Sequence, residues 1–431
     1  MTSARTFTDE VQAKAGETVI LQGWAQTIRL QSKIAFIILR DTRGLVQCVA
    51  LKDIADVFKQ IKALAQESVI AVTGQIQAAK QAPGGYEVVV EKLEILSAAD
   101  PKLAIPVVAK GDQAVDQNIR LDYRWLDLRQ PEKLLIFKVW TILEQAYREY
   151  FINQDFLEIH SPKLMSAPSE GGAELFSVDY FDRKAYLAQS PQFYKQMAMA
   201  AGFERVIEVG PVFRAEPSFT TRHATEFTSF DFEVSFIESH QDVMKIWEEG
   251  IVHMLTRVKE ACGLEITIPP ALFPRLTMAE AKAKLKSAGV TSEREGDLSP
   301  EEEKAISEII LNEQDHEFVF ITDYPIDVRP FYHMRHADQP ELTKSFDLLY
   351  KGVEITTGAQ REHRLDILKK QAEEKGVDLQ SIEHYLKFFQ YGCPPHGGAG
   401  IGPSRLIMKL LDAENIREVT FLHRGVNRLT P

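Results

Sequence analysis

The chain has few cysteines and no long apolar stretch, and each absence excludes a class of protein. Its three cysteines, Cys48, Cys262 and Cys393, are scattered without metal-ligand spacing, so they predict neither a disulfide framework nor a zinc site. No apolar run approaches the length of a membrane span, and the first residues, MTSARTFTDEVQ, contain no apolar signal core. We therefore expect a protein of the reducing cytoplasm with no membrane contact.

An excess of positive charge is also lacking. The chain has 50 Lys and Arg residues against 62 Asp and Glu residues, which gives a formal net charge of −12. This balance argues against a general nucleic-acid coat, although local basic patches could still bind one RNA. With 45 % hydrophobic and 26 % charged residues, the composition is typical of a soluble globular protein, and a length of 431 residues favours two domains.

The stretch from Val206 to Phe236 contains the clearest pattern in the chain. Phe230, Phe232, Val234 and Phe236 alternate with Ser229, Asp231, Glu233 and Ser235. This period of two predicts a strand with one apolar face on a core and one acidic face toward a cavity. The acidic face suits a magnesium ion or an amine.

A polar loop precedes this strand and contains Arg214, Glu216, Arg222 and His223. Another strand-like run comes before the loop, so the stretch is expected to form a hairpin. The loop cations could clamp a polyphosphate, because charge-assisted hydrogen bonds to phosphate are strong. The alternative is a solvated charged hairpin on an ordinary sheet, and the residues alone leave both interpretations open.

Residues 18–97 show short strand-like runs separated by the turn signals DTRG and APGG. Five runs with one helical segment, DIADVFKQIKALAQE, after the third have the order of an OB barrel, so residues 1–102 are expected to bind an oligonucleotide. On the open face of that barrel, Phe36 could stack on a base while Arg29, Gln47 and Glu87 contact base edges. Core packing of Phe36 is an equal alternative.

Residues 103–130 lose apolar periodicity and are expected to form a hinge to a second domain, residues 131–431. That domain begins with a helix that has Pro131 in its first turn and ends near Asn153. The strand that follows is interrupted at Pro162, which places it at a sheet edge where a second subunit could bind. Residues 277–314 read as short helices without recognisable chemistry, and EFVFITDYP and PFYHM as strands.

Further candidate residues lie on both sides of these segments. Gln192 and Lys195 share one face at the start of a helix, in surroundings typical of a pocket rim. Asp347 and Glu354 flank an expected strand and could bridge magnesium to phosphate oxygens, because magnesium takes few protein ligands. Arg361 follows a glycine turn at an expected helix start.

The string HGGAGIG places four glycines before a helix that is expected to begin near Ser404. Small residues let a nucleotide lie close to the backbone, and Arg405 could cover a base or bind the terminal phosphate. The string has no following βαβ unit, which argues against a dinucleotide-binding fold.

Together these segments resemble a class II aminoacyl-tRNA synthetase over nearly the whole chain. The helix and strand up to Pro162 are similar to motif 1, FRAEPSFTTRHATEFTSFDFE to motif 2 and GAGIGPSRLIMKLL to motif 3. SPQFYKQ, SFDLLYKGVEITTGAQREHR, CPPHGG and the terminal RLTP resemble aspartyl-tRNA synthetases of the archaeal and eukaryotic type, whereas asparaginyl enzymes have a different residue where Lys195 stands. The resemblance implies an α+β chain: an N-terminal OB-fold anticodon-binding barrel and a class II catalytic domain with an antiparallel sheet flanked by helices.

The resemblance also implies activation of aspartate by ATP to aspartyl-adenylate, and then transfer to the terminal adenosine of tRNA without a protein nucleophile. Lys195 and Arg361 would bind the side-chain carboxylate, and Arg214 would contact the α-phosphate. The other implied contacts are Glu170, Gln192 and Ser229, with Asp231 or Glu233, for the ammonium; Glu216, Arg222, His223, Phe227, Glu354, Thr357 and Arg405 for ATP; Asp347 and Glu354 for Mg²⁺; and Arg29, Phe36, Gln47 and Glu87 for the anticodon.

The choice of tRNA is open between tRNA(Asp) alone and tRNA(Asp) with tRNA(Asn). Gln26 stands where strictly discriminating archaeal relatives often have tryptophan, and the turn APGGYE resembles that of relaxed or asparaginyl enzymes, so the resemblance favours relaxed specificity. We also expect a homodimer, because the edge strand at Pro162 beside an apolar helix is what a twofold contact needs. Ala359, Ser404 and the terminal FLHRGVNRLTP depart from the usual pattern; Ser404 removes an acidic partner of Arg405 or of a metal.

Three other functions are alternatives at this stage. An asparaginyl-tRNA synthetase would share the architecture and the ATP site. A paralogue that makes asparagine without tRNA would have no use for the barrel. A non-catalytic RNA-binding module would bind tRNA but would not exchange pyrophosphate into ATP in the presence of aspartate.

Overall fold

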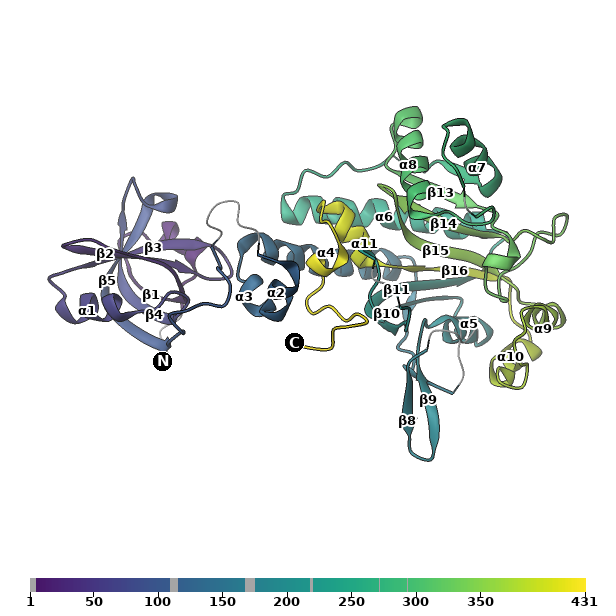
Figure 1. Cartoon of the computed structure of the whole chain (residues 1–431), viewed down its shortest axis with the longest axis horizontal. Coiled ribbons are helices and arrows are strands. Elements are labelled where there is room, and N and C mark those ends of the chain that lie inside the picture. Colours follow the sequence, from purple (N-terminus) through teal and green to yellow (C-terminus); the bar gives the residue numbers. More distant parts are fainter. Residues whose placement is uncertain (1–4, 109–114, 167–174, 218–219, 271, 293) are drawn as a thin grey trace. The chain divides into compact units, whose positions relative to one another are not determined.

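The computed structural model describes residues 5–108, 115–166, 175–217, 220–270, 272–292 and 294–431 (Figure 1). Its contacts divide the chain into two compact units, Met1–Leu134 together with Pro431, and Leu135–Thr430. Both α-helices and β-strands occur in each unit, so the predicted α+β class is confirmed.

The first unit contains a closed five-stranded barrel with the strand order β1-β2-β3-β5-β4. Its elements are β1 (Thr18–Leu30), β2 (Ile34–Arg40), β3 (Leu45–Leu51), α1 (Ala55–Ala63), β4 (Val69–Ala78) and β5 (Tyr86–Ser97). The helix follows the third strand, as the OB order requires, so this prediction is confirmed.

Alternating burial builds the barrel core. Along β1, for example, Val19, Leu21 and Ala25 are buried between half-exposed neighbours. Strands β4 and β5 approach so closely that a Cβ atom at Gly74 would overlap the backbone oxygen of Val89. Only glycine fits at this approach.

The segment that was expected to be a hinge, residues 103–130, contains two helices that the sequence did not predict. They are α2 (Gln117–Asp122) and α3 (Arg124–Asp127), and the Asp116 side chain caps the first by accepting hydrogen bonds from the backbone N–H groups of Asn118 and Ile119. Helices of 6 and 4 residues are too short to show an apolar period. The segment groups with the first unit by its contacts.

The second unit is built on an eight-stranded sheet in the order β12-β13-β14-β15-β16-β11-β10-β6. Its strands are β6 (Leu157–Glu158), β10 (Arg205–Phe213), β11 (Glu226–Ser235), β12 (Arg275–Thr277), β13 (Phe318–Thr322), β14 (Ser345–Tyr350), β15 (Val353–Arg361) and β16 (His396–Ile401). The six central strands are antiparallel, as predicted, but β12 and β6 pair in parallel at the two edges. These edge strands have 3 and 2 residues, which is too short for any pattern to reveal their direction.

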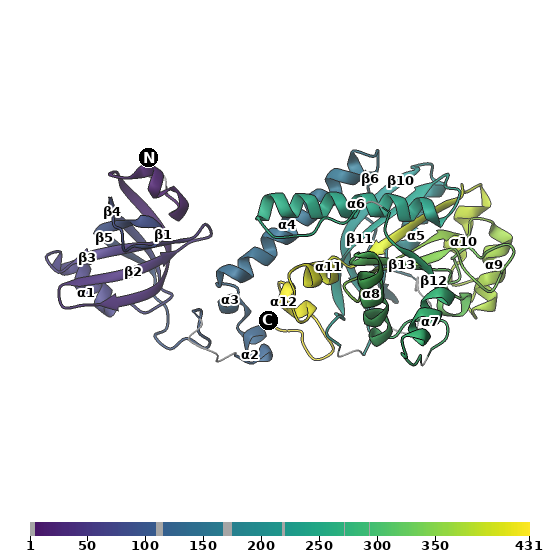
Figure 2. The same ribbon diagram turned by 90° about the horizontal axis from the view of Figure 1, so that it is seen from above.

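Two long helices, α4 (Pro131–Ile152) and α6 (His240–Cys262), lie against the sheet (Figures 1 and 2). Leu143 of α4 and Trp247 of α6 pack with Phe232 of β11 in one hydrophobic core. The Tyr147 hydroxyl donates to the backbone oxygen of Asp231 at 2.7 Å, so α4 is also tied to that strand by a buried hydrogen bond. Helices therefore cover the apolar face of β11 and leave its acidic face for the site.

Shorter elements surround this sheet. They are β7 (Leu164–Met165), β8 (Ser177–Tyr180), β9 (Arg183–Leu187), α5 (Gln192–Ala200), α7 (Met278–Ser287), α8 (Pro300–Gln314), α9 (Leu365–Glu374), α10 (Glu383–Gln390), α11 (Pro403–Leu410) and α12 (Ile416–Val419). The predicted strand at PFYHM was wrong, because residues 330–334 contain only an isolated bridge from His333 to Arg361. The expected strand at Pro162 is likewise reduced to β6 and β7 on either side of the proline.

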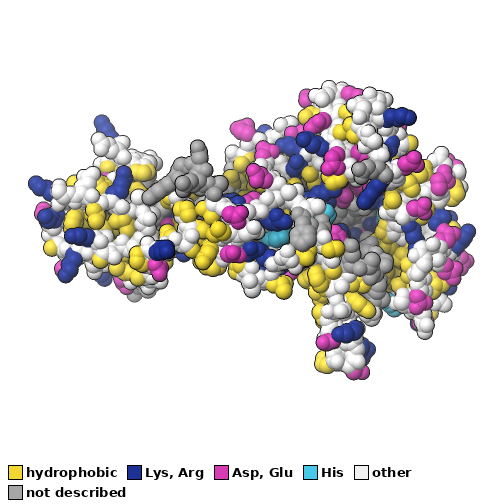
Figure 3. Space-filling view, in the orientation of Figure 1, with side chains coloured by type: hydrophobic (Ala, Val, Ile, Leu, Met, Phe, Trp, Pro, Cys, Tyr) yellow, Lys and Arg dark blue, Asp and Glu magenta, His cyan; other side chains and the backbone are white. Residues whose placement is uncertain are grey.

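The surface shown in Figure 3 carries both signs of charge, with Lys and Arg side chains interspersed among Asp and Glu. This mixture agrees with local rather than general basic patches. Among the helices in the described ranges, none is long and apolar enough to cross a membrane.

Gly74→Ala should destabilise the barrel, because the added methyl group has no room beside the Val89 carbonyl. Overpacking of this kind costs about 1–3 kcal/mol or more. Gln75→Ala, at the exposed neighbouring position, is the matched control and should change the free energy of unfolding by no more than about 0.5 kcal/mol. Chemical denaturation followed by circular dichroism measures both; equal stabilities of the two variants would contradict the close approach of β4 and β5.

Candidate functional site

A cavity of about 280 Å³ opens on the acidic face of the large sheet. Its walls come from α5, from β11 and the loop between β10 and β11, from β15 and β16, from residues 329–333 and from the N-terminal end of α11. The predicted site residues that line it are Gln192, Arg214, Glu216, Arg222, His223, Phe227, Ser229, Asp231, Glu354, Thr357, Arg361 and Arg405. The chain thus brings into one cavity residues that are more than 200 positions apart in sequence.

Strand β11 has the alternation that the sequence predicted. Phe230 and Phe232 belong to the core, whereas Asp231 and Glu233 lie on the opposite face of the strand. Phe236 was wrongly included in the pattern. It lies beyond the end of β11 with a φ of 58° and a side chain that is 68 % exposed, because the turn into α6 interrupts the period of two.

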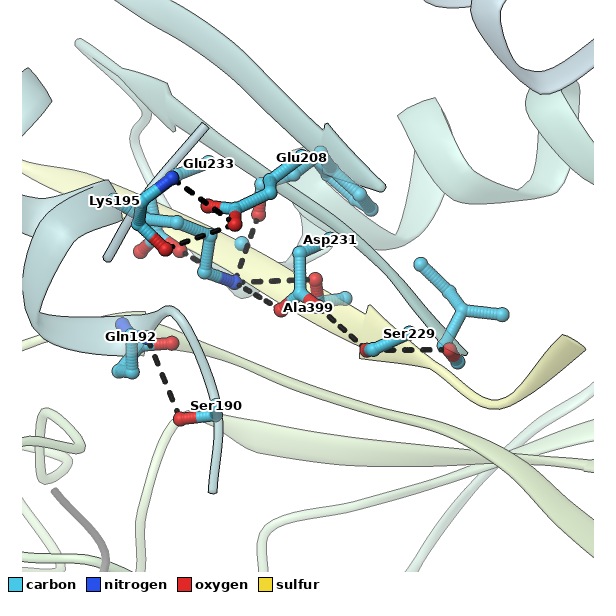
Figure 4. A network of polar contacts seen from close by, with 12 residues as sticks. Ser190, Gln192, Lys195, Glu208, Ser229, Asp231, Glu233 and Ala399 are labelled. Carbon is cyan, nitrogen blue, oxygen red and sulfur yellow. Dashed lines mark hydrogen bonds and ion pairs between the residues drawn. The ribbon is translucent and has the colours of Figure 1, made fainter. Parts of the chain in front are cut away.

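Lys195 is buried rather than on the pocket rim where it was expected, and its side chain is only 1 % exposed. Figure 4 shows that it extends from α5 toward the acidic face of β11. Its Nζ lies 2.9 Å from Asp231 Oδ1 and 3.3 Å from Glu233 Oε2, and it also donates to the carbonyl oxygens of Phe232 and Ala399. Burial of the ammonium is offset by two carboxylates.

Arg361 contacts Glu233 from another direction. Its Nε donates to Glu233 Oε1 at 3.0 Å, its Nη2 donates to the Gly398 carbonyl at 3.0 Å, and its Nη1 donates to His333 Nε2 at 2.9 Å. The residue ends β15 and does not start a helix as expected, because the strand continues past the glycine at position 358. Lys195 and Arg361 therefore converge on Glu233.

Burial alone would raise the pKa of Glu233, but Arg361 and Lys195 outweigh it and hold that pKa below its usual value. The carboxylate is thus ionised at neutral pH. By contrast, burial lowers the pKa of His333 well below its usual value, and Arg361 lowers it further. A neutral His333 is what accepting a hydrogen bond from Arg361 requires.

A buried polar chain fixes the helix that carries Lys195. The Tyr385 hydroxyl donates to Gln196 Oε1, and Gln196 Nε2 donates to His396 Nε2, each at 3.0 Å. His396 Nδ1 donates in turn to the Pro394 carbonyl at 2.8 Å. Burial lowers the pKa of His396 to about 4, so the ring stays neutral and keeps this tautomer.

The other end of the cavity carries the loop cations. The Arg214 guanidinium lies 5.5 Å from the centroid of the Phe227 ring, and Glu216 lies within 3.9 Å of Arg214 and 3.8 Å of His223. Arg405 donates to the Glu354 carbonyl at 2.9 Å and to the Arg222 carbonyl at 3.3 Å. The motif at the start of α11 thereby supports the hairpin loop.

Asp347 and Glu354 stand on neighbouring strands of one hairpin, β14 and β15, rather than on either side of a single strand. Asp347 does not line the main cavity. It lines a second cavity of about 310 Å³, which shares Glu354 and Arg222 with the first. Asp347 Oδ2 accepts from Arg329 Nη2 at 2.6 Å, whereas its buried Oδ1 has no hydrogen-bond partner within the described part of the chain.

The predicted anticodon residues lie on four consecutive strands of the barrel sheet. Arg29 of β1 pairs with Phe36 of β2, and its guanidinium is 5.8 Å from the centroid of that ring. Gln47 of β3 pairs with Glu87 of β5 and donates to its carboxylate at 2.8 Å. Phe36 is half-buried and lies outside the barrel core, so simple core packing does not explain it.

Three site residues had no recognised signal in the sequence. His333 comes from the predicted strand PFYHM, Arg329 from the segment just before it, and Glu303 from the helices without recognisable chemistry. The arginine of DVRP, placed between two strands, was the one available hint for Arg329. Glu170, predicted for the ammonium, lies outside the described residues.

A family model described as tRNA synthetases class II (D, K and N) matches residues 116–424. The chain belongs to this family. A second model, described as an OB-fold nucleic acid binding domain, matches residues 19–96 of this class II synthetase, the span of the barrel strands. The resemblance seen in its motifs is therefore confirmed.

Proteins named as aspartate–tRNA ligases align with nearly the whole synthetase. It is 45 % identical to the aspartate–tRNA(Asp/Asn) ligase of Methanopyrus kandleri, over 98 % of each chain. It is 43 % identical to the aspartate–tRNA(Asp) ligase of Pyrococcus abyssi, over 96 % of this chain and 97 % of the other. The asparaginyl-tRNA synthetase of Pyrococcus horikoshii, solved with asparaginyl-adenylate, matches all of both chains with a TM-score of 0.92 and 35 % identity.

Glu233→Gln keeps the volume of the side chain but removes the charge that Lys195 and Arg361 share. Because a buried cation without its partner is costly, we expect the free energy of unfolding at neutral pH to fall by about 3–5 kcal/mol. Glu226→Gln, at the exposed start of the same strand, is the control and should have an effect below about 0.5 kcal/mol.

The difference in the free energy of unfolding between Glu233→Gln and the wild type should also depend on pH. The folded-state pKa of Glu233 is lowered, so its stabilising contribution is complete above the ordinary glutamate range and is lost as the pH falls through the folded-state pKa. The free energies of unfolding of the two proteins, measured by denaturation from neutrality down to about pH 3, should therefore converge. A difference that stays constant over that range would show that Glu233 is not held as a carboxylate.

Proposed function

We propose that this protein is an aspartate–tRNA ligase, which activates aspartate with ATP and transfers it to tRNA(Asp). The observation that supports this best is the convergence of Lys195 and Arg361 on Glu233 beside a cavity lined by further arginines. The two aspartate–tRNA ligases described above, which align with 98 % and 96 % of the chain, carry this activity in their names.

The two cations select aspartate over asparagine. Arg361 lines the cavity, and Lys195 lies behind Asp231 at its wall. A side-chain carboxylate beside Arg361 gains a charge-assisted contact and the attraction of the buried Lys195 charge, whereas a neutral amide gains much less from either cation. This favours aspartate–tRNA ligase activity over asparaginyl-tRNA synthetase activity, although the asparaginyl-tRNA synthetase of P. horikoshii shares the fold.

The ammonium group of aspartate is bound by oxygen acceptors at the same end. Ser229 donates to Asp231 Oδ2 at 2.5 Å, which orients that carboxylate, and Gln192 lies across from it at the start of α5. Glu170 completes the set in this proposal. With the ammonium and the side chain held, the α-carboxylate is directed toward the phosphates.

The activation step needs no nucleophile from the protein. An oxygen of the aspartate α-carboxylate forms a bond to the α-phosphorus of ATP, and the bond from that phosphorus to the bridging oxygen of pyrophosphate breaks. Arg214 contacts the α-phosphate and stabilises the charge that develops there. In the second step a hydroxyl of the terminal adenosine of tRNA attacks the aspartyl carbonyl carbon, and AMP leaves.

ATP occupies the end of the cavity that carries the hairpin loop. Adenine lies between Phe227 and Arg405, with Glu216 accepting from its amino group. Arg222 and His223 face the β- and γ-phosphates, and Thr357 lies beside Glu354 on β15, to which its hydroxyl donates at 3.1 Å. Cations on one side and a ring on the other suit a nucleoside triphosphate.

Asp347 and Glu354 would hold the Mg²⁺ that accompanies ATP. The described residues contain no cluster of three or more acidic, His or Cys side chains ready to hold a metal, but magnesium is commonly held by one or two carboxylates with phosphate oxygens and waters. The buried Asp347 Oδ1 without a partner fits such a ligand. When bound, the ion neutralises charge on the phosphates.

The barrel, residues 1–102, binds the anticodon in this proposal, and residues 131–431 carry out catalysis. Phe36 stacks on a splayed base, with Arg29 alongside it, while Gln47 and Glu87 contact base edges. Because Gln26, on the same barrel, is a small polar residue whose side chain accepts from Arg40 at 3.0 Å, we extend the proposal to tRNA(Asn). One of the relatives described above acts on both tRNAs.

We also propose a homodimer in the cytoplasm. Strand β6 ends the large sheet after two residues, and Leu157 on it and the nearby Ile152 at the end of α4 are 53 % and 51 % exposed. A sheet edge with exposed apolar side chains suits a self-complementary contact. The three free thiols agree with a reducing compartment.

Aspartate-dependent exchange of pyrophosphate into ATP tests the proposed activity directly. The wild type should exchange with aspartate and not with asparagine. Lys195→Ala and Arg361→Ala should each lower kcat/KM for aspartate by about a hundredfold or more, because each removes a positive charge from the place where the substrate carboxylate is proposed to bind. Lys163→Ala, which removes a partly buried lysine paired with Glu208 outside the cavity, is the control. Exchange with asparagine alone would overturn the proposal.

Charging of purified tRNA(Asp) and tRNA(Asn) with aspartate tests the tRNA choice. The wild type should charge both, and Gln26→Trp should lower the charging of tRNA(Asn) by about tenfold while changing that of tRNA(Asp) by less than about twofold. Pyrophosphate exchange without tRNA is the internal control and should not change. Charging of tRNA(Asp) alone by the wild type would restrict the activity to one tRNA.

A further inference from the structure

One buried carboxylate beside the ATP site belongs to a part of the chain without assigned chemistry. Glu303, in the first turn of α8, is 4 % exposed. Its Oε2 lies 2.5 Å from Arg222 Nη1 and also accepts a hydrogen bond from the backbone N–H of Glu354 at 3.1 Å. One carboxylate oxygen therefore joins α8, the hairpin loop and β15.

The Arg222 guanidinium is fixed by a hydrogen bond from one of its nitrogens. Within the described residues, Nη1 is its one side-chain nitrogen with a hydrogen-bond partner, and that partner is Glu303. Nε and Nη2 form another edge of the same planar group, which can bind two oxygens of an anion side by side. Arg222 lines the main cavity, and its hydrogen bond to Glu303 uses Nη1 and not this edge.

The two charges also depend on one another. Burial raises the pKa of Glu303, and the adjacent Arg222 opposes that rise. The side chain of Arg222 is 17 % exposed, so without Glu303 it could rotate among several solvated positions. Glu303 thus removes rotamer freedom before the ligand arrives.

We propose that Glu303 is a positioning residue for the terminal phosphates: it fixes Arg222 by Nη1 so that the Nε–Nη2 edge faces the β- and γ-phosphates of ATP, or free pyrophosphate. This rests on the proposed function, which places those phosphates at Arg222. Glu303 itself touches neither phosphate. Glu303 therefore affects the affinity for the pyrophosphate part of ATP, and it leaves the affinities for aspartate and adenosine unchanged.

The position of the second cavity supports this assignment. It shares Arg222 and Glu354 with the main cavity and contains Glu303 and Asp347 in its wall. The ion pair of Arg222 and Glu303 therefore stands where the two cavities meet. The substrate can therefore contact Arg222 from the main cavity, while the carboxylates of Glu303 and Asp347 line the second cavity.

Steady-state pyrophosphate exchange with Glu303→Ala and Glu303→Gln tests the proposal. Glu303→Ala should raise KM for both ATP and pyrophosphate about tenfold, with KM for aspartate changed by less than about twofold. Glu303→Gln keeps an acceptor oxygen for Nη1 and should recover most of that loss. Binding of a non-hydrolysable aspartyl-adenylate analogue, which has no β- or γ-phosphate, should be the same in all three proteins.

Glu302→Ala is the matched control, because Glu302 is the adjacent buried acid of α8. It pairs with Lys282 at 2.7 Å and closes the capping box with Ser299, and it makes no contact with Arg222 among the contacts of the described chain. It should lower the thermal unfolding midpoint without changing KM for ATP. If it raised KM for ATP as much as Glu303→Ala does, displacement of α8 would explain the effect and the proposal would be overturned.

A double-mutant cycle isolates the route through Arg222. Arg222→Ala with Glu303→Ala should bind ATP no more weakly than Arg222→Ala alone, since in this proposal Glu303 affects the phosphates through that guanidinium and not through its hydrogen bond to Glu354. Additive losses would contradict this, as would an unchanged or lower KM for ATP in Glu303→Ala. A wild type without aspartate-dependent exchange would instead refute the proposed function, so the two failures are distinguishable.

Discussion

The buried pairing of Lys195 and Arg361 with Glu233 is the constraint on which the rest of the site depends. Ionised groups in a protein interior are stable only with good geometry and satisfied hydrogen bonds. The structure meets this demand from several directions: α5 supplies the lysine, β11 the carboxylates, β15 the arginine, and β16 the carbonyls of Gly398 and Ala399. The charge pattern that would recognise a dicarboxylic acid is therefore complete before the substrate arrives, which lowers the cost of binding it.

Strand β11 connects this ion cluster to the core. Its odd-numbered residues in the central part face the cavity, and its even-numbered residues pack against α4 and α6. A one-residue slip of the strand would exchange the two sets and place Asp231 in the core. The hydrogen bond from the Tyr147 hydroxyl to the Asp231 carbonyl opposes such a slip. Packing on one face thus fixes the electrostatics on the other.

The parts that the sequence predicted well are those with a local signal. The period of two in β11, the order of the barrel strands and the glycine string before α11 are all visible within a few residues. The convergence of the cations on Glu233 and the burial of Lys195 are not, because Arg361 Nε meets Glu233 across 128 positions. Glu303 meets Arg222 across 81 positions, and its own helix reads as an ordinary solvated one.

The errors have related physical causes. Arg361 was placed at a helix start because a glycine in a strand resembles a turn, yet here the glycine accommodates the Phe346 ring of the neighbouring strand. The sequence did not predict the parallel pairing of the edge strands β6 and β12, because both strands are too short to show a periodic pattern. Where tertiary contacts rather than local preference decide the conformation, a single sequence carries little information about it.

Strand β16 limits how this pocket could be altered by engineering. A Cβ atom at Gly398 would overlap both the Phe232 carbonyl and the Glu233 carboxylate, so β16 packs against the ion cluster through main chain and has no side chain there to trim. Acceptance of a bulkier or neutral amino acid would have to come from exchanging charges on α5 and β15 instead. Beside the ion cluster the spacing of β11 and β16 is set by the backbone, and substrate range in descendants of this enzyme should change by charge before it changes by size.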